Sequence, residues 1–435
     1  MMMEAGDESA PNENEFDNID INPPRFDDDS AQTNGDGKTN SQDASNIPDQ
    51  MISITVEEPQ KVGDGMGSYI AYKVCTTVKQ VPGFKKAQSV TIRRFSDFLG
   101  LHELLSGKYL KSGHIIPAPP EKNIIGTTKV KMNQQNEMKS STNNDWLENR
   151  RASLERYLNR TAQYKVLRSD PDFINFLESD EELPRAVSTS TLSGAGVMRL
   201  FNKVGETVNK ITYRMDENDQ WFNEKITEIE VIDIHLQKLY AATKSLYLNR
   251  KELAAYTGNV AKSTAVLSAC EEHTGLSRQL SQLANIEEKI ELLRSEQANS
   301  DLYILAEQMK DYLGLIGAVK DVFHERVKAF QNWEYAQMQL TKKRENKEKL
   351  ELQGRNEKLD WADKEVEDWN NKVIKLEKDF TNISEQIKRE IEEFDLQRVR
   401  DFKTIVIKYI EDQMAHQNQL MKYWQAYLQT ANEAL

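Results

Sequence analysis

The sequence predicts an α+β domain followed by an all-α domain made of three very long helices. Apolar and polar residues alternate in short runs between residues 52 and 92, which is the period of half-buried strands. After residue 216 the chain becomes poor in proline, and apolar residues recur at gaps of three and four, which is the period of a coiled coil. A chain of 435 residues has room for both domains.

Residues 1–50 are expected to be a disordered acidic tail. They are rich in Asp, Glu, Asn and Ser, and they contain too few apolar residues to offset the entropy lost on ordering. Two aromatics lie at acidic spots, in Glu15-Phe16-Asp17 and Arg25-Phe26-Asp27, so each position is either a short docking motif or simply part of a solvated tail.

Residues 51–180 are expected to form the α+β domain, which opens with an antiparallel sheet of three strands. Glycines at residues 63–67 separate the first two strands, and Pro82-Gly83 separates the second from the third. The strands are read from three alternating sets: Ile52, Ile54 and Val56; Ile70, Tyr72 and Val74; Val90 and Ile92.

Helices and one long loop follow the strands in this domain. Apolar stripes predict helices around Phe98–Leu105 and Trp146–Leu158, with cap candidates at residues 143–145, and Pro171 opens a last short helix. The loop between the first two helices starts at Pro117-Ala118-Pro119-Pro120 and runs to about residue 144. A loop of this length in a small domain usually has a function.

A linker at residues 181–215 is expected to contain an amphipathic helix. Its apolar residues fall on one helical face, with basic residues among the polar positions. The helix either packs on a neighbouring helix or lies in a lipid interface, where basic residues meet anionic head groups. The apolar positions that would insert are Val197, Leu200, Phe201 and Val204.

Residues 216–435 are expected to form three helices, with breaks at Thr274-Gly275 and Gly354-Arg355. The middle helix alone would be over ~100 Å long, so the bundle has a narrow core that a second chain is expected to complete. The coiled-coil seam of the third helix is Ala362, Val366, Trp369, Val373, Leu376, Phe380, Ile383 and Ile387, and it slips to another gap of four at Ile391.

Composition and motifs exclude several classes of function. The net charge of −13 disfavours nucleic acid as a partner, although residues 51–180 are net basic and suit an anionic surface. Two distant cysteines predict neither a disulfide framework nor a zinc finger, and the chain is read as cytosolic, without a signal peptide or membrane span. No catalytic or nucleotide-binding motif occurs, so no enzyme, no cofactor and no metal are expected.

The informative residues lie at the end of the third strand. The run RRFSDF at residues 93–98 is followed by the proline loop with Lys122, and then by RRASLERYL at residues 150–158. An arginine pair at a strand end is, by itself, most often a solvated edge. In this order, however, the three segments resemble the phox-homology (PX) domain.

The resemblance extends through the helical half. The segments ELPRAV at residues 182–187, LSGAG at 192–196, Trp221-Phe222, and the tail from Lys408-Tyr409 to residues 422–424 are similar to the sorting nexins with a C-terminal BAR domain. The closest branch is the retromer-associated pair, sorting nexins one and two. The acidic tail matches only in character, because the Asp-Leu-Phe repeats of similar proteins are missing.

The resemblance implies a phosphoinositide site. Arg94 would bind the 3-phosphate, because a planar guanidinium suits phosphate, and Phe95 would support the inositol ring. Lys122 would meet the 1-phosphate, and Arg150 the ring hydroxyls, whereas Arg93 would face away. Two apolar residues of the loop, Ile124 and Ile125, would insert into the bilayer.

The resemblance also implies partners and a location. Lys342-Lys343-Arg344 would be a basic surface of the BAR domain, although as a run of charge it is otherwise solvated. The chain would bind membranes with phosphatidylinositol 3-phosphate, or alternatively the 3,5-bisphosphate, as a homodimer or as a heterodimer with another BAR-type sorting nexin. It would work with retromer in endosome-to-Golgi transport, on the cytosolic face of early endosomes and their tubules. The rival reading is a coiled-coil adaptor that tethers proteins without shaping membrane.

Overall fold

A computed structural model of the chain describes residues 52–63, 68–120, 141–179, 181, 215 and 219–433. The acidic tail at residues 1–50 lies outside the described residues, as do most of the loop and nearly all of the linker. The predictions for Lys122, Ile124 and Ile125 therefore stay predictions. The same is true of the amphipathic helix with Val197, Leu200, Phe201 and Val204.

The three-stranded antiparallel sheet is confirmed, in the order β1-β2-β3. The strands are β1 (Ile52–Val62), β2 (Tyr69–Val78) and β3 (Gln88–Arg94). Val56 of β1 lies opposite Val74 of β2, and Cys75 of β2 lies opposite Val90 of β3. The period of two places Val56 and Val74 on the buried face and leaves Val90 exposed on the other.

Four helices and a short turn complete this domain: α1 (Phe95–Tyr109), the 3-10 turn η2 (Leu110–Ser112), α3 (Ser141–Gln163), α4 (Lys165–Arg168) and α5 (Pro171–Glu178). The helix α3 begins at Ser141, before the expected cap candidates, so Asn143, Asn144 and Asp145 fall within its range. The expected start of α5 is confirmed, because Asp170 accepts hydrogen bonds from the backbone of Asp172 and Phe173.

The core of the α+β domain lies between the sheet and its helices. Phe98 of α1 is fully buried, and its ring meets those of Tyr72 and Phe176 edge-on at 6.5 and 5.0 Å. Leu154 and Leu158 of α3 join the same core. Within the described residues this core is closed, that is, it is buried by side chains of the same domain, because the strands and the helices both turn their apolar faces inward.

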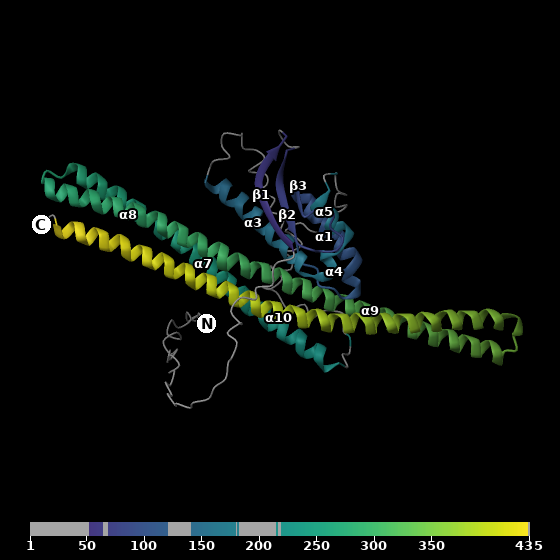
Figure 1. Cartoon of the computed structure of the whole chain (residues 1–435). Helices are drawn as coiled ribbons and strands as arrows, with labels where there is room; N and C mark the ends of the chain where they lie inside the picture. Colours follow the sequence, from purple (N-terminus) through teal and green to yellow (C-terminus); the bar gives the residue numbers. More distant parts are fainter. Residues whose placement is uncertain are drawn as a thin grey trace, which may run out of the picture. The chain divides into compact units, whose positions relative to one another are not determined.

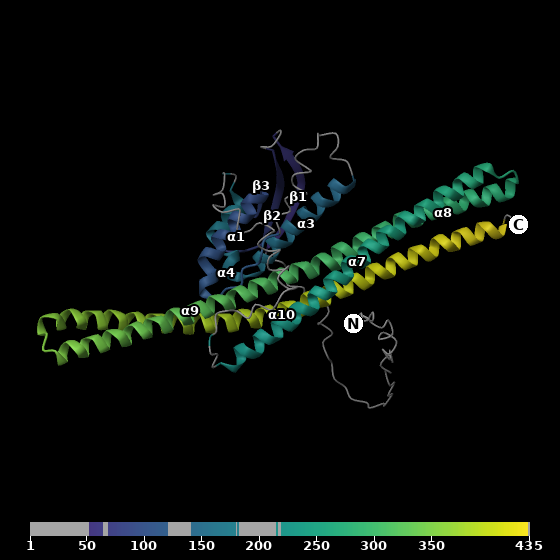
Figure 2. The same cartoon turned by 180° about the vertical axis from the view of Figure 1, so that it is seen from behind.

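The helical half contains α7 (Gln220–Cys270), α8 (Thr274–Ser300), α9 (Glu307–Leu352), the 3-10 turn η5 (Asn356–Lys358) and α10 (Leu359–Glu433). A π-helical segment, η4 (Asp301–Ala306), joins α8 to α9 without a break. Figure 1 and the reverse view in Figure 2 show α7 beside α8, and α9 beside α10. Three long helices therefore form this half, as expected.

The helix breaks are close to the expected positions. Gly354 ends α9 with a φ of 64°, a left-handed conformation that glycine adopts without strain. The first break is displaced: it lies at residues 271–273, and Gly275 stands in the first turn of α8. His273 caps this helix by accepting from the backbone of Leu276. A side-chain cap, and not the glycine, sets the boundary.

The seam expected along α10 packs against the other helices of the same chain. Ala362, Ile383, Ile387 and Ile391 are buried, and the spacing of three and four accounts for this burial. The ring of Phe380 stacks on Trp333 of α9 at 5.8 Å. No helix of the described part is long and apolar enough to cross a bilayer.

Candidate functional site

The candidate lipid site begins where β3 ends and α1 starts. Arg94 is the last residue of the strand and the N-cap of the helix. Its backbone N–H donates to Oδ2 of Asp97 at 3.0 Å, and its side-chain Nε pairs with Oδ1 of the same carboxylate at 3.0 Å. Asp97 at N3 therefore caps the helix and also orients the Arg94 guanidinium.

Of the three guanidinium nitrogens of Arg94, Asp97 pairs with Nε at 3.0 Å. The Arg94 side chain keeps 22% of its surface exposed, and its guanidinium carbon lies 5.8 Å from the ring centre of Tyr69. The two terminal nitrogens have no ion-pair partner in the described parts of the chain. They form an oriented fork of donors that suits a phosphate.

Arg150 meets this site from α3. Its guanidinium carbon lies 4.2 Å from the ring centre of Phe95 and 5.3 Å from that of Trp146. Only 7% of the residue is exposed. The positive charge of Arg150 also opposes the effect of burial at Tyr72, where burial is the stronger influence and raises the pKa to about 12.

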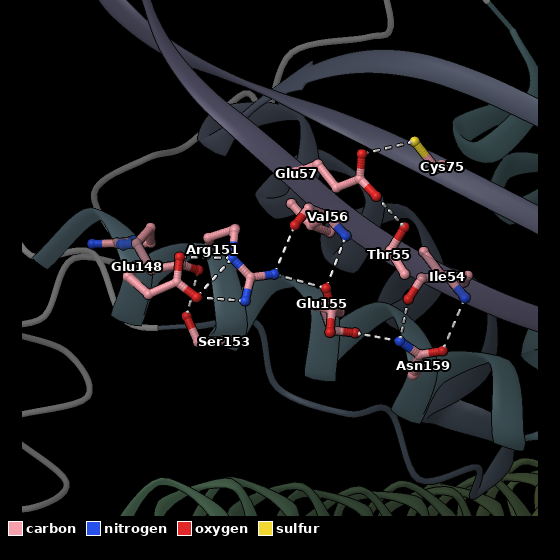
Figure 3. A network of polar contacts seen from close by, with 11 residues as sticks. Ile54, Thr55, Val56, Glu57, Cys75, Glu148, Arg151, Ser153, Glu155 and Asn159 are labelled. Atoms are coloured by element: carbon pink, nitrogen blue, oxygen red, sulfur yellow. Dashed lines mark hydrogen bonds and ion pairs between the residues drawn. The ribbon is translucent and has the colours of Figure 1, made fainter. Parts of the chain in front are cut away.

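Polar contacts with β1 hold α3 in place. Asn159 accepts from the N–H of Ile54 at 3.2 Å and donates to its carbonyl at 2.7 Å, as Figure 3 shows. Glu155 accepts from the N–H of Val56, and Arg151 donates to the carbonyl of Val56. These side chains form hydrogen bonds with the backbone groups of Ile54 and Val56 at the open edge of β1, and they fix the helix that carries Arg150.

The start of the proline loop is also anchored. One nitrogen of His102 lies 3.1 Å from the carbonyl of Pro117, and the other lies 3.3 Å from the Ser106 hydroxyl. Burial lowers the pKa of His102 to about 4, against the smaller opposing effect of the Pro117 contact. A neutral imidazole therefore holds the loop near the point from which Lys122, Ile124 and Ile125 follow in sequence.

The structure brings together Arg94, Phe95 and Arg150, and it places Arg93 elsewhere. Arg93 is 3% exposed and donates to the carbonyls of Phe176 and Ser179. Sequence reasoning missed Tyr69, Asp97 and Trp146 as neighbours of the site. The spacing of Trp146 and Arg150, four residues apart on one helix, was a signal for their contact.

The three residues of the basic cluster in the helical half, Lys342, Lys343 and Arg344, differ in exposure. Lys342 and Arg344 are exposed, whereas Lys343 is half-buried and pairs with Glu365 of α10 at 2.7 Å. The Nζ of Lys343 also lies 5.7 Å from the ring centre of Trp361. Two of the three basic side chains are thus available to an anionic surface.

The helical half exposes a second apolar seam that sequence reasoning missed. We call it the open seam, and its residues recur at gaps of three, four or seven along each of two helices. All of them are between 38% and 64% exposed. The open seam comprises Leu253, Tyr256, Val260 and Leu267 of α7, and Val399, Val406, Ile410, Met414, Met421, Trp424 and Leu428 of α10.

Comparisons with known proteins cover both halves of the chain. Residues 81–180 match the family model "PX domain", and residues 197–430 match "Vps5 C terminal like". Sorting nexin-2 of Bos taurus is 49% identical over 380 residues, which are 87% of this chain and 72% of the relative. Sorting nexin-1 of Homo sapiens is 46% identical over the same shares of the two chains.

A solved structure supports the same architecture. A chain from the cryo-EM structure of the SNX-BAR Mvp1 tetramer superposes with a TM-score of 0.58 at 16% identity. The match covers 86% of this chain and 99% of that one. At this identity the likeness shows the fold alone: a PX domain joined to a long helical domain of the BAR type.

Proposed function

The chain belongs to the sorting nexins that join a PX domain to a BAR-type helical domain, and we propose that it recognises 3-phosphoinositides and scaffolds curved endosomal membrane. Family membership gives it a membrane-associated sorting role. The observation that carries the finer proposal is the meeting of Arg94, Phe95 and Arg150 at one place on the PX domain.

The lipid head group would be held by complementary charge. The Arg94 fork would take the 3-phosphate of phosphatidylinositol 3-phosphate, or of the 3,5-bisphosphate, and Phe95 would lie under the inositol ring. Arg150 would meet the ring hydroxyls, and Lys122 the 1-phosphate. Insertion of Ile124 and Ile125 would add ~1 to 3 kcal/mol for each fully buried side chain.

The open seam supports dimerisation. Apolar residues at coiled-coil spacing on α7 and α10 stay in water unless another helical surface covers them. We assign this cover to a second copy of the chain, or to another BAR-type sorting nexin in a heterodimer. A dimer presents two head-group sites and two copies of Lys342 and Arg344, so that weak single contacts add up to avid binding.

The linker helix with Val197, Leu200, Phe201 and Val204 would insert into the outer leaflet and wedge the head groups apart. The protein would act in retromer-linked retrograde transport, on the cytosolic face of early endosomes and tubules. A Phe201→Glu variant is expected to lose tubulation of vesicles while remaining dimeric, and tubules that persist would contradict the role of this helix.

The lipid site is tested by sedimentation with vesicles of phosphatidylcholine, prepared with and without phosphatidylinositol 3-phosphate. Arg94→Ala removes the phosphate fork and is expected to lower lipid-dependent binding by roughly tenfold or more, since a charge-assisted bond contributes about 1.5 to 3 kcal/mol. Lys165→Ala is the matched control, because it removes an exposed charge elsewhere on the PX domain. Equal binding of Arg94→Ala and wild type would refute the site.

A further inference from the structure

Two arginines of the PX helix α3 pair with carboxylates of the helical half. The guanidinium of Arg160 pairs with Asp311 of α9 at 2.7 Å and also with Asp401 of α10. Its side chain is only 9% exposed. Arg156, one turn earlier, pairs with Glu307 of α9 at 2.7 Å. The four-residue spacing places Arg156 and Arg160 on one face of α3.

The surroundings of Arg160 make this contact specific. Its guanidinium lies 5.0 Å from the ring centre of Tyr312, whose hydroxyl donates to the Asp401 carboxylate. Burial by itself would lower the pKa of Arg160, but the charges of Asp311, Tyr312 and Asp401 outweigh burial and raise it. A buried cation held by carboxylates of two different helices is satisfied in few geometries.

A second contact lies at the start of the proline loop. Ile115 is fully buried in the apolar core of the helical half. Its N–H donates to Glu390 of α10, and the ring of His114 lies 2.7 Å from the same carboxylate. Gly113 has a φ of 90°, and a Cβ there would lie 3.1 Å from the carbonyl oxygen of Ile383.

Together these contacts connect the candidate lipid site to the coiled coil. Arg150 and Arg160 stand on one continuous helix, and the segment that begins at Gly113 leads into the loop that carries Lys122. We propose that Arg160 is a positioning residue. Together with Arg156 and the 113–115 segment it holds the PX domain on the helical half, and we call this set of contacts the lock. The head-group site then meets a membrane at an orientation fixed by the coiled coil. The membrane consequence of this inference rests on the proposed function.

The lock itself is tested without lipid. The chain has two cysteines, Cys75 on the PX sheet and Cys270 at the end of α7, which provide one spin-label pair across the two domains. Labelled chain is diluted with unlabelled chain so that only distances within one copy contribute. Wild type is expected to give a single narrow distance distribution, and Arg160→Met a broad one.

Two further variants keep the lock test decisive. Arg389→Met is the matched control, because it removes an exposed arginine that pairs with Glu385 on the same helix, and its distribution is expected to stay narrow. Asp311→Asn keeps the side-chain volume and removes one of the two carboxylates, so it covers the case in which Arg160→Met does not fold. Distributions as narrow as wild type in both Arg160→Met and Asp311→Asn would overturn the proposal.

The positioning role is tested by comparing two lipid probes. Binding of a soluble short-chain phosphatidylinositol 3-phosphate to Arg160→Met is expected to stay within about twofold of wild type, because Arg94 and Arg150 are intact. Binding to vesicles carrying the same lipid is expected to fall by roughly tenfold, because the two sites of a dimer no longer engage together. Unchanged vesicle binding with a broadened distance distribution would overturn the positioning role.

If wild type does not bind vesicles with phosphatidylinositol 3-phosphate, the proposed function is refuted, and the spin-label distances still decide whether the lock exists. If Arg160→Met loses both the soluble lipid and the vesicles while it stays folded, Arg160 supports the PX domain as a whole, and its role as a positioning residue is refuted.

Discussion

The PX domain and the helical half differ in how completely each buries its own apolar residues. Phe98, Leu154 and Phe173 of the PX domain are fully buried within one chain. The helical half buries a core around Val319 and Ile387, yet it leaves the open seam of α7 and α10 in water. One region is therefore closed by its own chain, and the other needs a second helical surface.

The difference follows from geometry. A small sheet covered by helices encloses a compact core, whereas three very long helices present a narrow core and a large surface. Apolar residues at coiled-coil spacing on an exposed face are buried only when another helix packs against them. A charged substitution on the open seam should therefore weaken dimerisation, whereas one on the exposed face of the PX sheet should not.

The largest effect is expected on the open seam. Ile410→Asp places a charge at a residue of α10 that is 50% exposed in one chain and covered in the proposed dimer. Two symmetric copies would each lose about 1.5 to 3 kcal/mol, so dimerisation weakens by about 3 to 6 kcal/mol. Light scattering should then report the monomer mass of 50.1 kDa.

The matched control for the open seam lies on the PX sheet. Ile92 is 59% exposed, and Ile92→Asp is expected to leave the dimer mass unchanged because the PX core is already closed. If Ile410→Asp remains dimeric, or if Ile92→Asp dissociates the dimer, the contrast between the two regions is wrong.

A smaller effect is expected in the PX core. Leu154→Ala removes a fully buried side chain and should lower the free energy of unfolding of this domain by about 2 to 5 kcal/mol. Hydrogen exchange should show faster exchange in β1–β3 and α3, with α10 protected as in wild type. Leu154→Met, a near volume-conserving change, should cost less than about 1.5 kcal/mol. Equal loss of protection in both regions would show that they unfold together.

The smallest effect is a pH dependence with a defined sign. The pKa of His102 is about 4 in the folded domain and ordinarily 6.5, so the native state resists protonation. Its contribution to stability is present above pH 6.5 and is lost as the pH falls toward 4, by about 1 to 2 kcal/mol between pH 7 and pH 5. Denaturant unfolding of the PX domain at both pH values measures this loss, and His102→Gln should reduce it.

In the helical half, one carboxyl changes stability with pH in the opposite direction. Burial raises the pKa of Asp301, the first residue of the π-helical segment, against the opposing charge of Arg250. A raised carboxyl pKa contributes stability that is lost as the pH rises. Acidification should therefore lower the stability of the PX domain through His102 and should not lower that of the helical half through Asp301, and a PX domain equally stable at pH 7 and pH 5 would contradict the assignment of His102.

Much of the fold could be predicted because its signals are local. The alternation of apolar and polar residues predicted the three strands, and apolar residues at gaps of three and four predicted the buried seam at Ile383 and Ile387. The helix start expected at residues 143–145 was wrong, because cap-forming residues also occur inside helices when the flanking sequence continues the helix. The open seam has the same local period, and following α10 beyond Ile391 would have found it.

The site was predictable only in part. The resemblance to PX domains pointed to Arg94, Phe95 and Arg150, and the Arg150 guanidinium does lie over the Phe95 ring, next in sequence to Arg94. Their role in lipid binding stays a prediction. The pairing of Arg160 with Asp311 and Asp401 leaves no periodic signature, because charged residues crowd every helix face of this chain. Contacts between distant charged residues are decided by tertiary packing, which a single sequence does not reveal.

In the proposed function, lipid recognition by the PX domain and curvature recognition by the helical half act together. Its most direct test is binding of the intact chain to vesicles of graded diameter, with and without phosphatidylinositol 3-phosphate. Binding is expected to require the lipid and to rise as the vesicle diameter falls. Binding that depends on neither the lipid nor the diameter would contradict it and favour a coiled-coil adaptor.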